Sequence, residues 1–243
     1  MLQVCPNGLL DHSVPFSPDE LAASVRDAVV AGAEDIHLHP KGPDGVDSLQ
    51  PDHVAAAIQA VRAAAPGIRV GVTTGAWACP DPRRRVDLVE SWKVLPDHAS
   101  VNWHEEGAEL VADALLDHGV AIEAGIFSGT GAAQRFLAWP SRHRVLRVLA
   151  EVVDTDPRTA PATAAALLAE LAPNERPVLL HGEQGGAWPV LRLAASLGLD
   201  TRIGLEDTLL LPDGSAAPDN AALVRAARRI LSENDGQPQQ SAG

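Results

Sequence analysis

Short apolar runs alternate with Ala- and Leu-rich helical patterns along almost the whole chain, and this alternation constrains the fold most. A strand followed by a helix is the repeating unit of α/β proteins with parallel sheets. The predicted strands are Leu2–Pro6, Asp35–His39, Arg69–Thr74, Ala99–Trp103, Ala121–Phe127, Val145–Leu149, Pro177–His181 and Thr201–Leu205. The predicted helices cover residues 18–30, 51–64, 83–94, 105–117, 130–138, 158–171, 187–197 and 218–232. Eight such units in 243 residues match the count and size of a (β/α)8 TIM barrel.

Two other architectures fit the same length. A chain of this size could form two small domains, or it could form a doubly wound sheet. The first strand–helix turn has no G-x-G-x-x-G, which favours the barrel over the doubly wound sheet. We therefore expect one TIM-barrel catalytic domain over residues 1–232, followed by a polar, disordered tail at 233–243.

Charge and cysteine content limit the class of function. The chain has 32 acidic and 19 basic residues, a formal net charge of −13, which argues against binding to nucleic acid or to an anionic membrane. It has no apolar run of ~18 residues, and its N-terminus lacks the basic and apolar regions of a signal peptide. Two cysteines, Cys5 and Cys79, are typical of reduced thiols. We expect a cytoplasmic protein.

His37-Leu38-His39 at the end of the second predicted strand suggests a metal site. Side chains at i and i+2 of a strand point to the same face, so the two imidazoles can approach one ion. Glu206 ends the eighth predicted strand and adds a carboxylate. Two His and one carboxylate, with a fourth position open, are typical of a catalytic Zn²⁺. We predict that His37, His39 and Glu206 bind the metal.

The eighth strand carries a second candidate pair. Arg202 and Glu206 share a face by the period of two, and Asp207 enters the following loop. An Arg beside an Asp holds that carboxylate in place, an arrangement found for general bases.

Other strand ends are also polar, and active sites of TIM barrels lie at the C-terminal ends of the strands. His181 is as consistent with a loop cap as with a ligand contact, and Cys5 is expected to be a small buried hydrophobe. Thr73, Gly75, Ser100, Asn102 and Glu123 lie on or at the ends of the third, fourth and fifth predicted strands, where a barrel enzyme would hold its substrate.

Taken together, these residues and their neighbours resemble the β-keto acid cleavage enzyme family. The stretches that carry the resemblance are Cys5-Pro6-Asn7-Gly8, Ile36-His37-Leu38-His39-Pro40, Val72-Thr73-Thr74-Gly75, Ala99-Ser100-Val101-Asn102, Ile122-Glu123-Ala124-Gly125 and Arg202-Ile203-Gly204-Leu205-Glu206-Asp207-Thr208-Leu209. The resemblance implies a TIM barrel that forms homo-oligomers, tetramers or dimers. It also implies a Zn²⁺ or similar divalent ion on His37, His39 and Glu206, and an Asp207–Arg202 pair. The groups that hold substrate in the family fall on Thr73, Gly75 and Ser100.

The implied reaction condenses a β-keto acid with acetyl-CoA and gives acetoacetate and a new acyl-CoA. Family members often carry an acidic residue shortly after the first strand, where this chain has Leu9-Leu10, so we expect a less cationic substrate than an amino-keto acid. Two alternatives remain open at this stage. One is a metal-dependent hydrolase of amidohydrolase type, and the other is a non-catalytic barrel that binds a metabolite.

Overall fold

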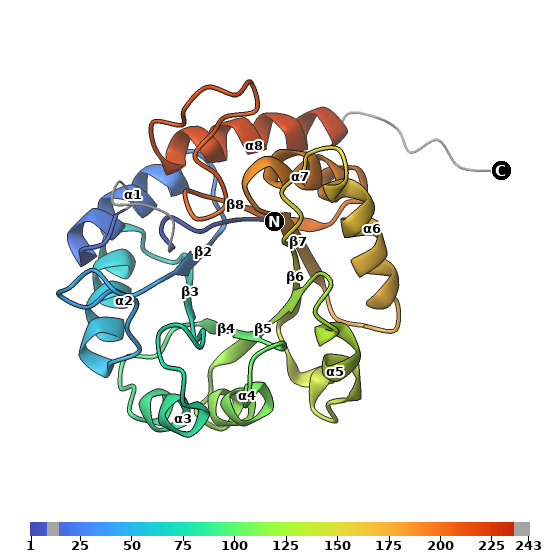
Figure 1. The fold of residues 1–243 in the computed structure, drawn as a ribbon. Coiled ribbons are helices and arrows are strands. Elements are labelled where there is room, and N and C mark those ends of the chain that lie inside the picture. The colour runs from blue at the N-terminus through green and yellow to red at the C-terminus, as the bar shows by residue number, and fades with distance from the viewer. Residues whose placement is uncertain (9–14, 236–243) are drawn as a thin grey trace.

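The computed structural model describes residues 1–8 and 15–235, which form a closed barrel of parallel strands surrounded by helices (Figure 1). The strands are β1 (Leu2–Val4), β2 (Asp35–Leu38), β3 (Arg69–Thr73), β4 (His98–Asn102), β5 (Ala121–Phe127), β6 (Arg147–Val152), β7 (Val178–Gly182) and β8 (Asp200–Ile203). The helices are α1 (Pro18–Val30), α2 (Pro51–Ala64), α3 (Pro82–Glu90), α4 (Ala108–Asp117), α5 (Ala132–Ala138), α6 (Ala160–Glu170), α7 (Ala187–Ser196) and α8 (Asn220–Asp235). The strands pair in chain order and β8 returns to β1, which confirms the predicted TIM barrel.

Several element boundaries differ from the prediction. β6 begins and ends later than expected, because the chain around Arg142–Arg144 forms a short 3-10 helix before the strand. As a result Glu151 lies on β6, in register with His181 of β7. Helix α8 continues to Asp235, past the predicted end at 232. The remaining predicted tail, 236–243, and the Leu9-Leu10 pair both lie outside the described residues.

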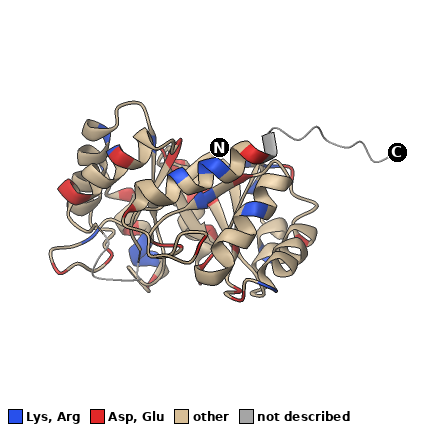
Figure 2. Cartoon of the chain, turned by 90° about the horizontal axis from the view of Figure 1, so that it is seen from above, with Lys and Arg blue, Asp and Glu red and all other residues tan. Residues whose placement is uncertain are grey.

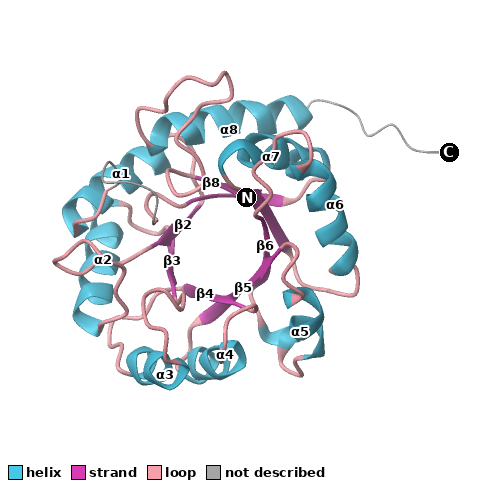
Figure 3. Cartoon of the chain, viewed as in Figure 1, coloured by secondary structure: helices cyan, strands magenta, loops and turns pink. Residues whose placement is uncertain are grey.

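The helices form a continuous outer layer around the strands (Figure 3). Helix α1 begins with a capping box, in which Ser17 and Glu20 satisfy each other's backbone N–H groups, and Pro18 occupies the first turn. Its buried residues, Leu21, Val25 and Ala28, belong to the core between helices and barrel. Burial of such apolar stripes contributes about 25 cal/mol for each Å² removed from water.

Acidic and basic positions are distributed over helices and loops on both sides of the barrel (Figure 2). In the part of the chain that the structure describes, no helix has the length and apolar character needed to cross a membrane.

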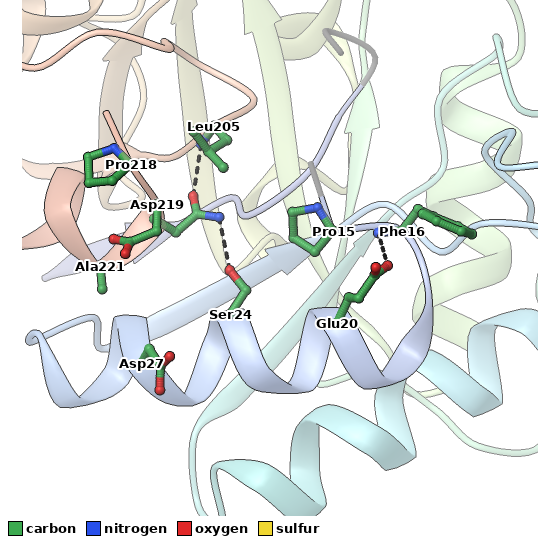
Figure 4. A pocket seen from close by; sticks show the side chains of 10 residues that line it. Pro15, Phe16, Glu20, Ser24, Asp27, Leu205, Pro218, Asp219 and Ala221 are labelled. Atoms are coloured by element: carbon green, nitrogen blue, oxygen red, sulfur yellow. Dashed lines mark hydrogen bonds between the residues drawn. The ribbon is translucent and has the colours of Figure 1, made fainter. Parts of the chain in front are cut away.

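Asn220, the first residue of α8, ties that helix to the closing edge of the barrel. Its side chain accepts from the Leu205 backbone N–H at 2.9 Å and donates to the Pro6 carbonyl and the Ser24 hydroxyl at 3.0 Å each. Figure 4 shows two of these bonds beside a pocket between α1 and the start of α8. Because Leu205 precedes Glu206, this tether also fixes the segment that carries the predicted metal ligand.

The barrel interior contains buried charge as well as apolar side chains. Asp35 of β2 and Glu123 of β5 are fully buried, as is His98 of β4, while Arg147 of β6 is 3 % exposed. His98 lies between the two carboxylates, with Nε2 at 2.9 Å from Asp35 and Nδ1 at 3.2 Å from Glu123. Arg147 contacts the same two carboxylates at 3.0 and 2.5 Å.

The four charges balance when His98 is protonated. Burial lowers the pKa of His98, but Glu123 and Asp35 outweigh it and raise that pKa to about 9. Two cations then neutralise two anions, which is the condition under which buried charges are tolerated.

Because the pKa of His98 is raised, the stability of the protein should depend on pH. Because the folded-state pKa of His98 is raised, its contribution is fully present below its ordinary pKa of 6.5 and is lost as pH rises through about 9. We expect His98→Gln to lower the free energy of unfolding by about 3 kcal/mol at pH 6, because one buried partner is lost. The difference between wild type and variant should shrink as pH approaches 9. Urea unfolding of both proteins across this range checks it, and a constant difference would contradict it.

Candidate metal and catalytic site

The two histidines of the H-x-H motif lie together at the C-terminal end of β2, as predicted. Their rings are 5.4 Å apart between centroids, and both side chains are nearly fully buried. The side chain of Asn7 bonds the backbone of His39 in both directions, accepting from its N–H at 3.0 Å and donating to its carbonyl at 2.8 Å. These bonds extend the β1–β2 pairing beyond the strands and fix where His39 points.

Glu206 joins the histidines from the segment that follows β8. Its Oε1 lies 3.1 Å from His39 Nε2. The position of Glu206 requires a glycine at residue 8, because a Cβ there would come within 2.5 Å of the Glu206 Cγ. Burial would raise the pKa of Glu206, but Arg202 and His39 hold it well below its ordinary value, so the carboxylate is ionised.

Cys5 is a fourth donor that the sequence interpretation placed only as a buried hydrophobe. Single donor atoms of Cys5, His37, His39 and Glu206 all lie within 4.8 Å of one another. The topology of the barrel could have indicated this position of Cys5. Closure of the barrel sets the end of β1 between β2 and β8, and the other donors lie at the ends of those two strands.

His39 has outer partners that set its orientation. Its Nδ1 lies 2.7 Å from Asp47, which also accepts from the Trp77 indole at 2.7 Å and pairs with Lys41. Burial would raise the pKa of Asp47, but His39 and Lys41 lower it to about 2. A carboxylate on Nδ1 leaves Nε2 facing the donor cluster, the arrangement usual for metal-binding histidines. The Trp77 ring stacks on the His39 ring at an interplanar angle of 10°.

Glu123, which the sequence predicts to bind substrate, lies next to His37. Its Oε2 is 3.5 Å from His37 Nδ1, and its other oxygen accepts from Gln3 and Arg147 at 2.9 and 2.6 Å. The Glu123 carboxylate is therefore fully buried among protein side chains. Burial lowers the pKa of His37, although Glu123 acts in the opposite direction.

Asp207 and Arg202 form the pair that the sequence suggested. Arg202 donates from Nε at 3.0 Å and from Nη2 at 2.7 Å, both to Oδ1 of Asp207. The other oxygen, Oδ2, is buried and has no hydrogen-bond partner among the described residues. Arg202 Nη2 also lies 3.3 Å from Glu206, so one guanidinium serves both carboxylates.

The remaining predicted substrate residues lie at the ends of β3 and β4. Thr73, Ser100 and Asn102 are buried there, and the Thr73 hydroxyl accepts from the Gly75 N–H at 3.2 Å. A Cβ on Gly75 would come within 2.3 Å of the Trp77 ring, so the glycine makes room for the indole. The Asn102 amide donates to Glu105 at 2.9 Å, which holds the loop after β4.

Comparison with known proteins assigns the family. The model of the beta-keto acid cleavage enzyme family matches residues 4–242. This chain belongs to that family. The sequence resemblance is therefore confirmed.

Two relatives agree with the family assignment. The chain is 28% identical to a 3-oxoadipate:acetyl-CoA acetyltransferase from Cupriavidus necator, over 91% of this chain and 82% of the relative. It is 22% identical to a 3-keto-5-aminohexanoate cleavage enzyme from Fusobacterium nucleatum, over 91% of this chain and 85% of the relative. The chain is thus an enzyme of a family that acts on β-keto acids.

Solved structures support the fold alone. The 3-dehydroquinate dehydratase from Geobacillus kaustophilus aligns with a TM-score of 0.62 at 12% identity, covering 96% of this chain and 90% of that one. The enzyme of the same name from Aquifex aeolicus aligns with a TM-score of 0.59 at 13% identity, covering 96% and 98%.

Proposed function

We propose that this protein is a metal-dependent acyltransferase that condenses a β-keto acid with acetyl-CoA and forms acetoacetate and a new acyl-CoA. The observation that carries the proposal is the juxtaposition of two units at one end of the barrel. One is a cluster of donors on β1, β2 and β8, and the other is a carboxylate with a free, buried oxygen next to it. The acetyl-CoA co-substrate is supported by the name of the Cupriavidus relative.

The donors fit a divalent ion such as Zn²⁺, which accepts imidazole, carboxylate and thiolate ligands. His37, His39 and Glu206 would hold it, since each has an outer partner that directs its donor atom inward: Glu123, Asp47 and Arg202 respectively. The Cys5 thiol lies 3.2 Å from the Asn7 carbonyl, to which it donates. We therefore assign three ligands to the metal and leave Cys5 out of the ligand set. When bound, the metal would act as a Lewis acid on the keto oxygen of the substrate.

Asp207 is the general base in this mechanism. Its Oδ2 accepts the proton on the carbon between the keto and carboxylate groups, while Arg202 holds Oδ1. The resulting carbanion attacks the thioester carbonyl of acetyl-CoA, and CoA leaves. CoA then attacks the original keto carbon, the C–C bond breaks, and the proton returns from Asp207 to acetoacetate. All atoms of the β-keto acid and acetyl-CoA are recovered in acetoacetate and the new acyl-CoA, so no other reactant is needed.

The β3–β4 side of the barrel end is assigned to substrate contact. The groups assigned are the hydroxyl of Thr73, which accepts from the Gly75 N–H, and the hydroxyl of Ser100. Hydroxyl groups can donate to the carboxylate of a β-keto acid.

Acetoacetate formation should be assayed first with 3-oxoadipate and 3-keto-5-aminohexanoate, with and without acetyl-CoA. Acetyl-CoA-dependent product from any β-keto acid tried would support the proposal, and stoichiometric metal with no such product would sink it.

Metal content distinguishes a three-ligand site from a four-ligand site. We expect Glu206→Ala to lose bound metal, because it removes an ionised ligand. Cys5→Ala is the matched control and should retain about one ion per chain, since catalytic sites keep one position open. Elemental analysis after gel filtration measures both. Loss of metal from Cys5→Ala would establish a closed four-ligand site.

The base should act on the keto acid even without acetyl-CoA. We expect wild type to exchange the α-protons of a β-keto acid in D₂O, and Asp207→Asn to slow this by about 10²- to 10⁴-fold, because the amide cannot accept the proton. Proton NMR follows the exchange. Equal rates in the two proteins would rule out Asp207 as the base.

A further inference from the structure

His181, at the end of β7, is a buried imidazole that the mechanism above does not use. It is 0 % exposed, and neither ring nitrogen has a hydrogen-bond partner among the described residues. It lies between two carboxylates, with Nδ1 at 3.4 Å from Asp207 Oδ1 and Nε2 at 3.5 Å from Glu151 Oε2. Burying an imidazole destabilises a protein unless the ring is paired with an opposite charge or forms hydrogen bonds, so the burial of His181 requires an explanation.

The groups around His181 favour its protonated form. Burial and Arg202 lower the pKa of His181, but Asp207 and Glu151 outweigh them and raise it to about 9. Both ring nitrogens then carry hydrogens that face carboxylates. Glu183 is a further carboxyl near Glu151, and its pKa is raised to about 8 by burial and by the Glu151 charge. The pKa of Glu151 itself is lowered, with His181 as the largest cause that opposes its burial, so Glu183 carries the proton and the set around His181 avoids an excess of negative charge.

We propose that His181 is a positioning residue of the proposed base, which holds Asp207 through Oδ1 and leaves Oδ2 available to accept a proton. This inference rests on the proposed function. Oδ1 of Asp207 faces three N–H groups, two from Arg202 at 3.0 and 2.7 Å and one from His181 at 3.4 Å. Every partner thus lies on one oxygen, and the other oxygen has none among the described residues.

His181 and Arg202 differ in what else they touch. Arg202 is shared between Asp207 and the proposed metal ligand Glu206. Within residues 1–8 and 15–235, the ion pairs of His181 run to Asp207 and Glu151 alone. A change at His181 should therefore impair proton abstraction and leave the metal in place, whereas a change at Arg202 should affect both.

The test compares His181→Phe and His181→Gln in the α-proton exchange assay without acetyl-CoA, with metal content measured on the same samples. His181→Phe removes both N–H groups, and we expect the maximal exchange rate to fall by about 10²-fold, as for a misplaced catalytic group. The KM for the keto acid should stay within about twofold and the metal content should not change. His181→Gln should recover part of the rate, because its amide can donate to Asp207 Oδ1.

Glu151→Gln is a second variant that keeps the size of the side chain and removes the charge partner of His181, and it should also lower the exchange rate with metal retained. It keeps the test decisive if His181→Phe does not fold. Wild-type exchange with unchanged rates in the folded variants would overturn this inference alone. A lower rate accompanied by loss of metal would also overturn it, in favour of a structural role. Absence of exchange in wild type, as in Asp207→Asn, would overturn the proposed function and the role of His181 with it.

Discussion

The balanced set of buried charges inside the barrel is the constraint on which the functional end depends. His98 and Arg147 neutralise the buried Asp35 and Glu123, and Arg69 adds a further ion pair to Asp35. The first four of these side chains link β2, β4, β5 and β6 across the interior, at the level below the histidines. Glu123 belongs both to this set and to the surroundings of His37. The orientation of a proposed metal ligand is therefore coupled to the electrostatics of the core.

The C-terminal end of the barrel carries different groups on its two sides. The side from β6 through β7 and β8 to β1 and β2 holds the cluster of Cys5, His37, His39 and Glu206, and the Asp207 carboxylate with its partners. The side at β3 and β4 offers hydroxyl, amide and backbone groups, and the buried Arg85–Glu105 ion pair bonds Thr74 and Asn102 there. In the proposed reaction, charge develops on the substrate near the first side, while the second side binds a group that does not react.

Contacts within or next to one strand could be predicted from the sequence, because the period of two and the barrel geometry decide them. His37 and His39, two apart at a strand end, share one site, and Arg202 and Asp207 form a pair. The sequence placed Glu123 at a strand but could not tell that four protein side chains surround its carboxylate. The contact of Glu151 could not be predicted, because the predicted strand ends at Leu149 whereas β6 continues to Val152.

By itself the sequence determined the fold class, the family and the proximity of His37 and His39, since each follows from local periodicity or from short stretches in a fixed order. Only the tertiary structure decided which distant side chains meet. Cys5 lies beside His37 because closure of the barrel brings the first and last strands together. Likewise, His181 faces Glu151 because the β6–β7 register sets these residues opposite each other. Such contacts depend on register and closure, which are properties of the whole sheet and not of any one segment.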